Sequence, residues 1–331
     1  MGYLAGDTIL DDEYNVFVNQ ASTPFGINSL MGTGTGNIGL GQAVLPTINA
    51  GEVITAAKWN ALFTAMDNIG NHTNPATANA GTSARTAGDP IAAVAAITAD
   101  LGRLEDEVQG GSVRATALAA GSEDLSLVAS AVYDTSHICE ASFTFAGGDE
   151  TRFFFNAGGK LRINFTNAKT NDTGKDASVD ALIAALGNLD IGATVSTRSG
   201  SGETLTANGL ALGYFDLTTS YQTVIHLTED SGDYSGDIAV VKIEMKSAGA
   251  HGDGRGNTGI VITVKCSLLQ NETTRDDYTS GNLSSIAIEE EAVGPTDFSF
   301  RTMDPTTAQG LDPVYISIAV ASVSNAIVNA D

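Results

Sequence analysis

The sequence is poor in basic residues and in charge of any kind. It has 16 Lys and Arg against 39 Asp and Glu, a formal net charge of −23, and charged residues fill 17% of its 331 positions. The basic residues form no cluster that could follow a phosphate backbone. The composition therefore argues against direct binding to nucleic acid and against adsorption to an anionic membrane surface.

Long apolar runs and a leader pattern are also missing. No segment approaches the length of apolar sequence that crosses a bilayer. The opening MGYLAGDTILDDE has neither a basic region nor an apolar region of the secretory type. We therefore expect no signal peptide and synthesis in the cytoplasm.

Cysteine is scarce, and the two cysteines, Cys139 and Cys266, each fall on the apolar phase of an alternating segment. This position favours two buried free thiols, because an unpaired cysteine behaves as a small hydrophobic residue. A disulfide is possible only if the two segments are neighbouring strands, which the sequence does not decide.

Catalytic patterns are absent as well. The four histidines lie in separate segments without metal-ligand spacing, and no Gly-x-Ser-x-Gly elbow occurs. The string GTGNIG at 34–39 has the letters of a dinucleotide fingerprint, but Gly41 and Pro46 follow where a helix should begin, so we interpret it as a loop. We expect no enzyme activity and no cofactor.

The loop AGAHGDGRGNTG contains alternating oxygen donors, of which Asp253 and Asn257 are candidate calcium ligands. Its spacing differs from that of an EF-hand, which also needs a bidentate Glu at its end. A solvated hairpin tip explains the loop more simply, and we expect no bound metal.

Helical patterns occupy the first third of the chain. Thr55 is a suitable cap for a helix with Trp59, Leu62, Phe63, Met66 and Ile69 on one face. After Pro90, a heptad seam is formed by Val94, Ile97, Leu101, Leu104 and Val108. The seam covers barely two heptads, so the helix must pack on its own domain or bundle with copies of itself.

From about residue 125 the pattern changes to period 2, with turn residues between about ten expected strands. The first are HICEASFTF, Arg152–Phe155 and Lys160–Phe165, with a short helix at 179–189. The others are Leu210–Leu217, Thr223–Thr228, Ile238–Lys246, Gly259–Leu269, Leu283–Glu289, Asp297–Arg301 and Val314–Val323.

These patterns predict an α+β fold. We expect an N-terminal docking region with short helices and Gly-rich loops at 1–89, a short heptad helix and linker at 90–124, and an antiparallel, jelly-roll-like β-sandwich at 125–331.

The expected hairpin around Asn-Ala-Gly-Gly has one irregular strand. Apolar and polar residues alternate in Lys160–Phe165, whereas Phe153, Phe154 and Phe155 occupy both faces of the preceding strand. A solvent-facing Phe154 would expose an apolar spot. Phe154 is therefore the candidate for burial between the sheets or against another subunit.

Several stretches carry a family likeness: RFFFNAGGKLRINF, YFDLTTSYQTVIHL, VKIEMK with GIVITVKCSL and, nearer the N-terminus, GINSLMGTGTGNIGLGQ and VITAAKWNALFTAMDNIGNH. They resemble virion structural proteins of tailed bacteriophages, of the tail-, neck- or fibre-associated kind known from cyanophages and other aquatic phages. The shared motifs are structural, and the family has no active site to carry over.

The resemblance implies a non-enzymatic particle subunit that resides in the virion and contacts other virion proteins. Since fibres are typically trimers, it implies a homotrimer, with the heptad seam as its self-association surface. Two alternatives are a receptor-binding tip that recognises a host glycan and a capsid decoration protein. A third, a depolymerase, has no supporting constellation in the sequence.

Overall fold

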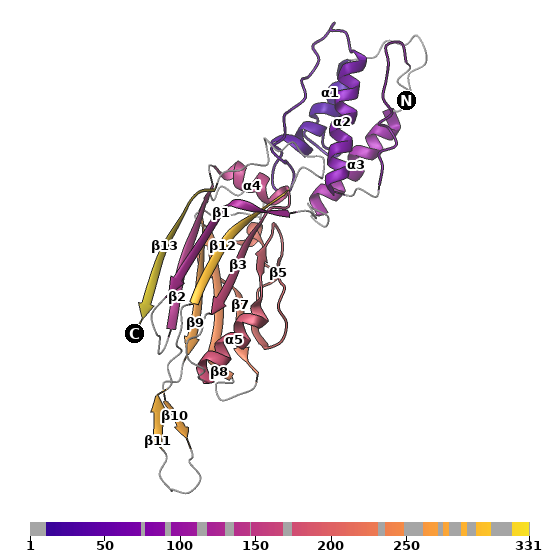
Figure 1. Cartoon of the computed structure of the whole chain (residues 1–331). Helices are drawn as coiled ribbons and strands as arrows, with labels where there is room; N and C mark the ends of the chain where they lie inside the picture. The colour runs from indigo at the N-terminus through magenta and orange to yellow at the C-terminus, as the bar shows by residue number, and fades with distance from the viewer. Residues whose placement is uncertain are drawn as a thin grey trace.

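The computed structural model describes residues 11–73, 77–89, 94–110, 118–129, 136–145, 147–167, 174–230, 236–247, 261–270, 274–277, 286–289, 296–305 and 320–330. A helical unit and a β-sandwich lie end to end in an elongated molecule (Figure 1). The predicted α+β fold, with helices first and antiparallel sheets after them, is confirmed.

The helical unit contains α1 (Asp11–Asn19), the π-helical turn η1 (Asn28–Gly32), α2 (Ala56–Thr73) and α3 (Val94–Gly110). Its core surrounds Trp59, which is 1% exposed. The ring of Tyr14 meets the indole edge-on at 5.4 Å, and Phe63 lies 5.9 Å away. The helix predicted after Thr55 is thus confirmed as α2.

Helix α3 is packed within its own chain. Its apolar seam belongs to the core that contains Trp59: Ile97, Leu101, Leu104 and Val108 are 0–3% exposed, and Val94 is partly buried. On its polar side, Asp100 accepts the N–H of Gly81 (2.8 Å), and Glu105 accepts the N–H of Phe25 (2.9 Å). Of the two packings that the sequence left open, the structure has the intrachain one, so this seam is not free for a second copy.

The segment boundaries shift accordingly. The helix assigned to a separate 90–124 segment is part of the helical unit, which extends through Gly110, and the first strand begins at Leu118.

Asparagine side chains hold extended backbone against the helices. In each case the amide donates to the carbonyl and accepts from the N–H of one residue, as a neighbouring strand would. The pairs are Asn15 with Ile48, Asn28 with Leu45 and Asn60 with Arg85, at 2.7–2.9 Å. These bonds satisfy backbone groups in segments that lack regular secondary structure.

Two antiparallel sheets form the sandwich. The five-stranded sheet has the order β1 (Leu118–Ala129), β12 (Thr296–Pro305), β3 (Lys160–Asn167), β4 (Leu189–Ile191) and β5 (Ser196–Arg198). The six-stranded sheet has the order β13 (Val320–Ala330), β2 (Ser136–Phe145), β9 (Val261–Gln270), β8 (Gly236–Ser247), β7 (Gln222–Glu229) and β6 (Thr204–Asn208).

The main core lies between these sheets. Alternate residues of both inner faces are buried there, among them Phe143, Ile163, Phe165, Ile243, Val264, Phe298 and Phe300. Since β4 and β5 have three residues each, the five-stranded sheet covers β7 and β8 incompletely. Helix α5 (Gly174–Leu186), the helix predicted at 179–189, contacts β3, β7 and β8 and completes the cover.

A separate two-stranded sheet, β10 (Thr274–Asp277) with β11 (Ile286–Glu289), projects from the end of the sandwich farthest from the helical unit (Figure 1). Its second strand confirms part of the prediction at 283–289. Strand β13 likewise confirms part of the prediction at 314–323. Residues 278–285 and 306–319 lie outside the described residues.

Two predicted strands are wrong. The segment Leu210–Leu217 contains a turn and the 3₁₀ turn η2 (Tyr214–Asp216). Its carbonyls bind one residue of β5 instead of a neighbouring strand: the N–H of Ser196 donates to Leu210, and the hydroxyl of Ser196 donates to Leu212. The segment Arg152–Phe155 is helical and leads to the site described next.

Candidate functional site at the junction of the two units

Helix α4 (Gly148–Asn156) occupies the stretch that the sequence predicted as a strand. Asp149 and Glu150 lie in its first turn, where carboxylates interact favourably with the helix dipole. At its other end, Gly158 donates to the carbonyl of Phe155 (3.0 Å) and Gly159 to that of Phe154 (2.9 Å). These two bonds form a Schellman motif. The hairpin prediction failed because a Gly-Gly pair suits a hairpin turn and a helix end equally well.

Phe154 lies in the sandwich core of its own chain. It is 1% exposed, and its ring centroid is 5.5 Å from that of Phe145 and 5.2 Å from that of Phe155. The chain passes over the ring at Gly159, where an added Cβ would lie 2.6 Å from the ring atoms. Of the two places expected for Phe154, the structure uses the one inside the sandwich.

Arg152 leaves the opposite side of α4 and enters the helical unit, where its side chain is 3% exposed. The guanidinium donates to four carbonyls of one loop: those of Ile38 at 2.5 Å, Gly36 at 3.4 Å, Gly34 at 3.5 Å, and Thr33. A buried charge needs such partners to replace its lost hydration. The ion pair with Asp149 (2.9 Å) adds little, because that carboxylate is 66% exposed.

Asn156 lies one turn after Arg152 and extends the same contact. Its amide donates to the carbonyls of Gly36 (2.9 Å) and Gly39 (3.0 Å). The next residue, Ala157, is buried in the core of the helical unit, whereas Phe154 and Phe155 are buried in the core of the sandwich. Helix α4 and the residue that caps it therefore contribute to both cores. We call Arg152 and Asn156, with the carbonyls they bind, the clamp.

The loop that receives the clamp is the Gly-rich string that looked like a dinucleotide fingerprint. Its N–H groups at Gly39, Leu40 and Gly41 bond back to the carbonyls of residues 30–32 at 3.0 Å each. Gly39 has φ +98°, and an added Cβ would lie 2.4 Å from the carbonyl oxygen of Thr33. The carbonyl oxygens of the loop face the guanidinium of Arg152, an arrangement that suits a cation. A phosphate-binding loop presents N–H groups instead.

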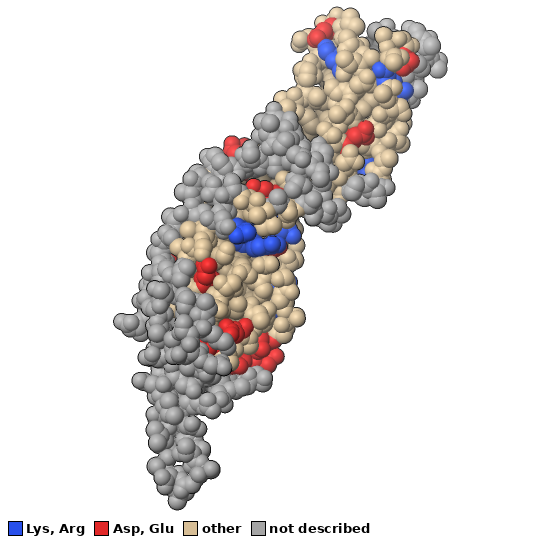
Figure 2. Space-filling model, viewed as in Figure 1, with Lys and Arg blue, Asp and Glu red and all other residues tan. Residues whose placement is uncertain are grey.

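A row of basic side chains lies on the outer face of the five-stranded sheet. Arg162 and Arg301 are register partners on β3 and β12, and Lys160 lies two residues along on the same face. Figure 2 shows basic side chains together on the sandwich below the helical unit. Asp190 binds Arg162 with both carboxylate oxygens (2.7 and 2.8 Å), which raises the pKa of that guanidinium. We call Lys160, Arg162 and Arg301 the basic row.

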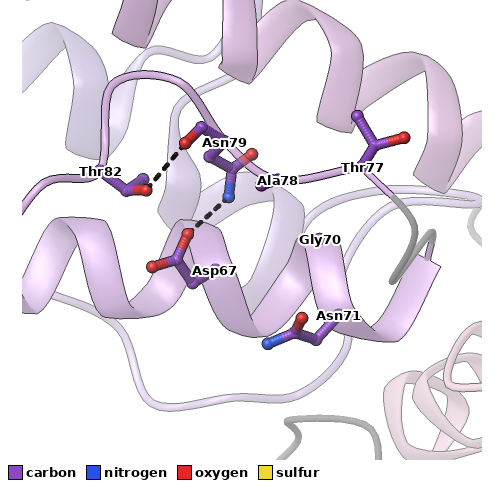
Figure 3. Close-up of a pocket in the computed structure, with 7 residues that line it drawn as sticks. All are labelled: Asp67, Gly70, Asn71, Thr77, Ala78, Asn79 and Thr82. Carbon is purple, nitrogen blue, oxygen red and sulfur yellow. Dashed lines mark hydrogen bonds between the residues drawn. The ribbon is translucent and has the colours of Figure 1, made fainter.

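A polar pocket of about 330 Å³ lies between α2 and the 77–82 segment (Figure 3). Its lining residues are Asp67, Gly70, Asn71, Thr77, Ala78, Asn79 and Thr82. The amide of Asn79 donates to Asp67 (2.9 Å) and accepts from Arg103, and Thr82 donates to the carbonyl of Asn79 (3.1 Å). These bonds hold the 77–82 segment onto the helices, so we assign the pocket a structural use.

The calcium candidates Asp253 and Asn257 lie outside the described residues. Within the described ranges, no group of three or more His, Cys, Asp or Glu side chains is placed to hold a metal ion. Among the helices that the structure describes, none combines the length and the apolar character needed to cross a membrane.

By its fold the chain is an α+β protein in which a helical unit and an antiparallel sandwich share one helix. Comparison with protein-family models, curated proteins and solved structures finds no match for this chain.

Arg152→Lys tests the clamp. Lysine keeps the charge but has no planar fork to reach several carbonyls, so we expect the free energy of unfolding to fall by about 2–4 kcal/mol. Limited proteolysis should then cut the 33–41 loop before the sandwich. Arg162→Lys, the same change in a partly exposed ion pair, should lower the free energy of unfolding by less, because a lysine can still bind Asp190 and Arg162 keeps more access to solvent than Arg152. Equal denaturant midpoints for the two variants would contradict the role of the clamp.

Proposed function

We propose that this chain is a non-enzymatic structural subunit of a tailed-phage particle. In this proposal it is a tail, neck or fibre component whose helical unit docks onto the particle and whose sandwich points outward. The resemblance of several stretches to virion proteins supports it. Two of these stretches, GINSLMGTGTGNIGLGQ and RFFFNAGGKLRINF, lie far apart in the sequence and bind one another through the clamp.

The observation that carries the proposal is the end-to-end arrangement fixed by the clamp (Figure 1). An appendage must hold its outer domain at a defined position relative to its base. Helix α4 meets this need because Phe154 and Phe155 are buried in the core of the sandwich, whereas Arg152 and Asn156 bind the loop of the helical unit and Ala157, just after the helix, lies in that unit's core. The joint thus consists of a packed helix with a buried, multiply bonded arginine.

We keep the homotrimer as the proposed state, since fibres are typically trimeric. The heptad seam does not supply the contact, because its side chains are buried within the chain. The basic row is a better candidate surface. In a chain of net charge −23 it gathers three basic residues, of which Arg162 is already paired with Asp190, and an acidic side chain of a neighbouring copy would meet positive charge there.

Electron cryomicroscopy of purified particles of the phage that encodes the chain tests this proposal. We expect three-fold density for the subunit, with the helical unit against the particle and the sandwich outside. Density on the head surface would favour the decoration alternative. Absence of the chain from purified particles, shown by mass spectrometry, would refute the structural role.

The projecting β10–β11 hairpin favours a second candidate function, a receptor-binding tip. It lies at the end farthest from the proposed docking unit, where a host surface glycan would be met first. Labelled full-length protein should then bind host cells, and deletion of residues 274–289 should abolish binding while the thermal transition of the sandwich is unchanged. Equal binding by both forms would exclude the hairpin as the tip.

A further inference from the structure

The only two cysteines of the chain lie opposite each other on neighbouring strands, on the same face of the six-stranded sheet. Cys139 on β2 and Cys266 on β9 are register partners in an antiparallel pair. Both side chains are fully buried on the core side of the sheet, and both thiols are free. The fold has therefore brought together two thiols from segments that lie far apart in the sequence.

This placement suits a covalent bond between the strands. Directly opposed residues of antiparallel strands have Cα atoms about 4.5–5.5 Å apart. A disulfide accepts Cα separations of about 4.4–6.8 Å. The Cα separation expected from this register therefore lies within the range that a disulfide accepts.

The closed sandwich protects the thiols from reaction. Burial raises the pKa of the Cys139 thiol to about 12 and raises the pKa of Cys266 as well, so both thiols are protonated at neutral pH. The thiolate is the reactive species in disulfide exchange. Both cysteines therefore react only slowly while the sheets are packed together.

We propose that Cys139 and Cys266 form an intramolecular disulfide when the chain meets a disulfide oxidant before its two sheets have packed together. The packed sandwich then shields the bond. The inference does not depend on the proposed particle role. It assigns the chain a modification site whose state is set by the redox conditions under which it folds.

The reaction balances with a small disulfide such as oxidised glutathione as the oxidant. One cysteine thiolate attacks it, forms a mixed disulfide and releases one glutathione thiolate. The second cysteine thiolate attacks the protein sulfur of the mixed disulfide and releases the other glutathione. In sum, the two thiols give up two protons and two electrons, and one glutathione disulfide becomes two thiols.

The bond would stabilise the folded chain. It closes a loop that runs from β2 through the strands β3 to β8 and back to β9, and a long loop loses much chain entropy in the unfolded state when it is closed. We expect an increase in Tm of about 5–10 °C that reductant reverses.

The experiment is to refold the full-length chain from urea in a glutathione redox buffer, block remaining thiols with iodoacetamide and map the peptides by mass spectrometry. The expected product is one cross-linked peptide pair that joins Cys139 to Cys266, together with the higher Tm. Folded chain held in the same buffer should remain reduced over the time in which the unfolded chain becomes bridged.

The matched control is the double variant Cys139→Ala, Cys266→Ala, whose Tm should not respond to glutathione. Reduction of the refolded wild-type chain is a second control, and it needs no substitution. Intermolecular dimers, glutathione retained on separate cysteines, or a bridge that lowers Tm would overturn the proposal. Equal bridging rates for folded and unfolded chain would overturn the shielding.

Discussion

The buried guanidinium of Arg152 connects the two halves of this protein. It lies in the helical unit although its helix is packed in the sandwich. There it donates to backbone carbonyls, and within its own helix it contacts the exposed Asp149 and the ring of Phe153, 4.8 Å away. Because a buried charge without partners is costly, the loop must keep its shape for the arginine to stay. The loop in turn keeps its shape through its glycines and its bonds to the residues of η1. The position of the sandwich relative to the helices follows from these contacts.

The clamp is one case of a wider use of polar side chains in this chain. Asn15, Asn28 and Asn60 each pair with one backbone residue, and Glu105 and Asp100 accept backbone N–H groups. Long segments of the helical unit lack regular secondary structure, so their backbone groups need such partners. Although the sequence has few charged residues, several of its charged side chains are buried and form hydrogen bonds with backbone groups, as Asp100, Glu105 and Arg152 do.

The strongly periodic parts of the fold were predictable. Strands β2, β3 and β9 alternate cleanly because one face of each is core, and α2 has apolar residues on one face. Three consecutive phenylalanines before Asn156 show neither the helical nor the strand spacing of apolar residues. The glycines after Asn156 suit a hairpin turn and a helix end equally well, so α4 was missed. A heptad seam has the same spacing whether its partner is the same chain or a copy, so the packing of α3 could not be deduced.

The candidate site was hidden for a related reason. The acidic first turn and the glycines after Asn156 are signals of a helix, but nothing in the sequence pairs Arg152 with residues 33–39. Strands β4 and β5 were missed because three residues are too few to show alternation. The facing of Cys139 and Cys266 depends on strand order and register, which the order of residues alone does not give.

The clamp makes one rigid body of the two units, and a distance measurement tests this rigidity most directly. Spin labels at Val53→Cys in the helical unit and Val195→Cys in the sandwich, both exposed positions, would be placed in a chain whose native cysteines are alanine. Pulsed dipolar spectroscopy should then give a single narrow distribution of distances. A broad distribution, as expected for two units on a flexible tether, would contradict the account.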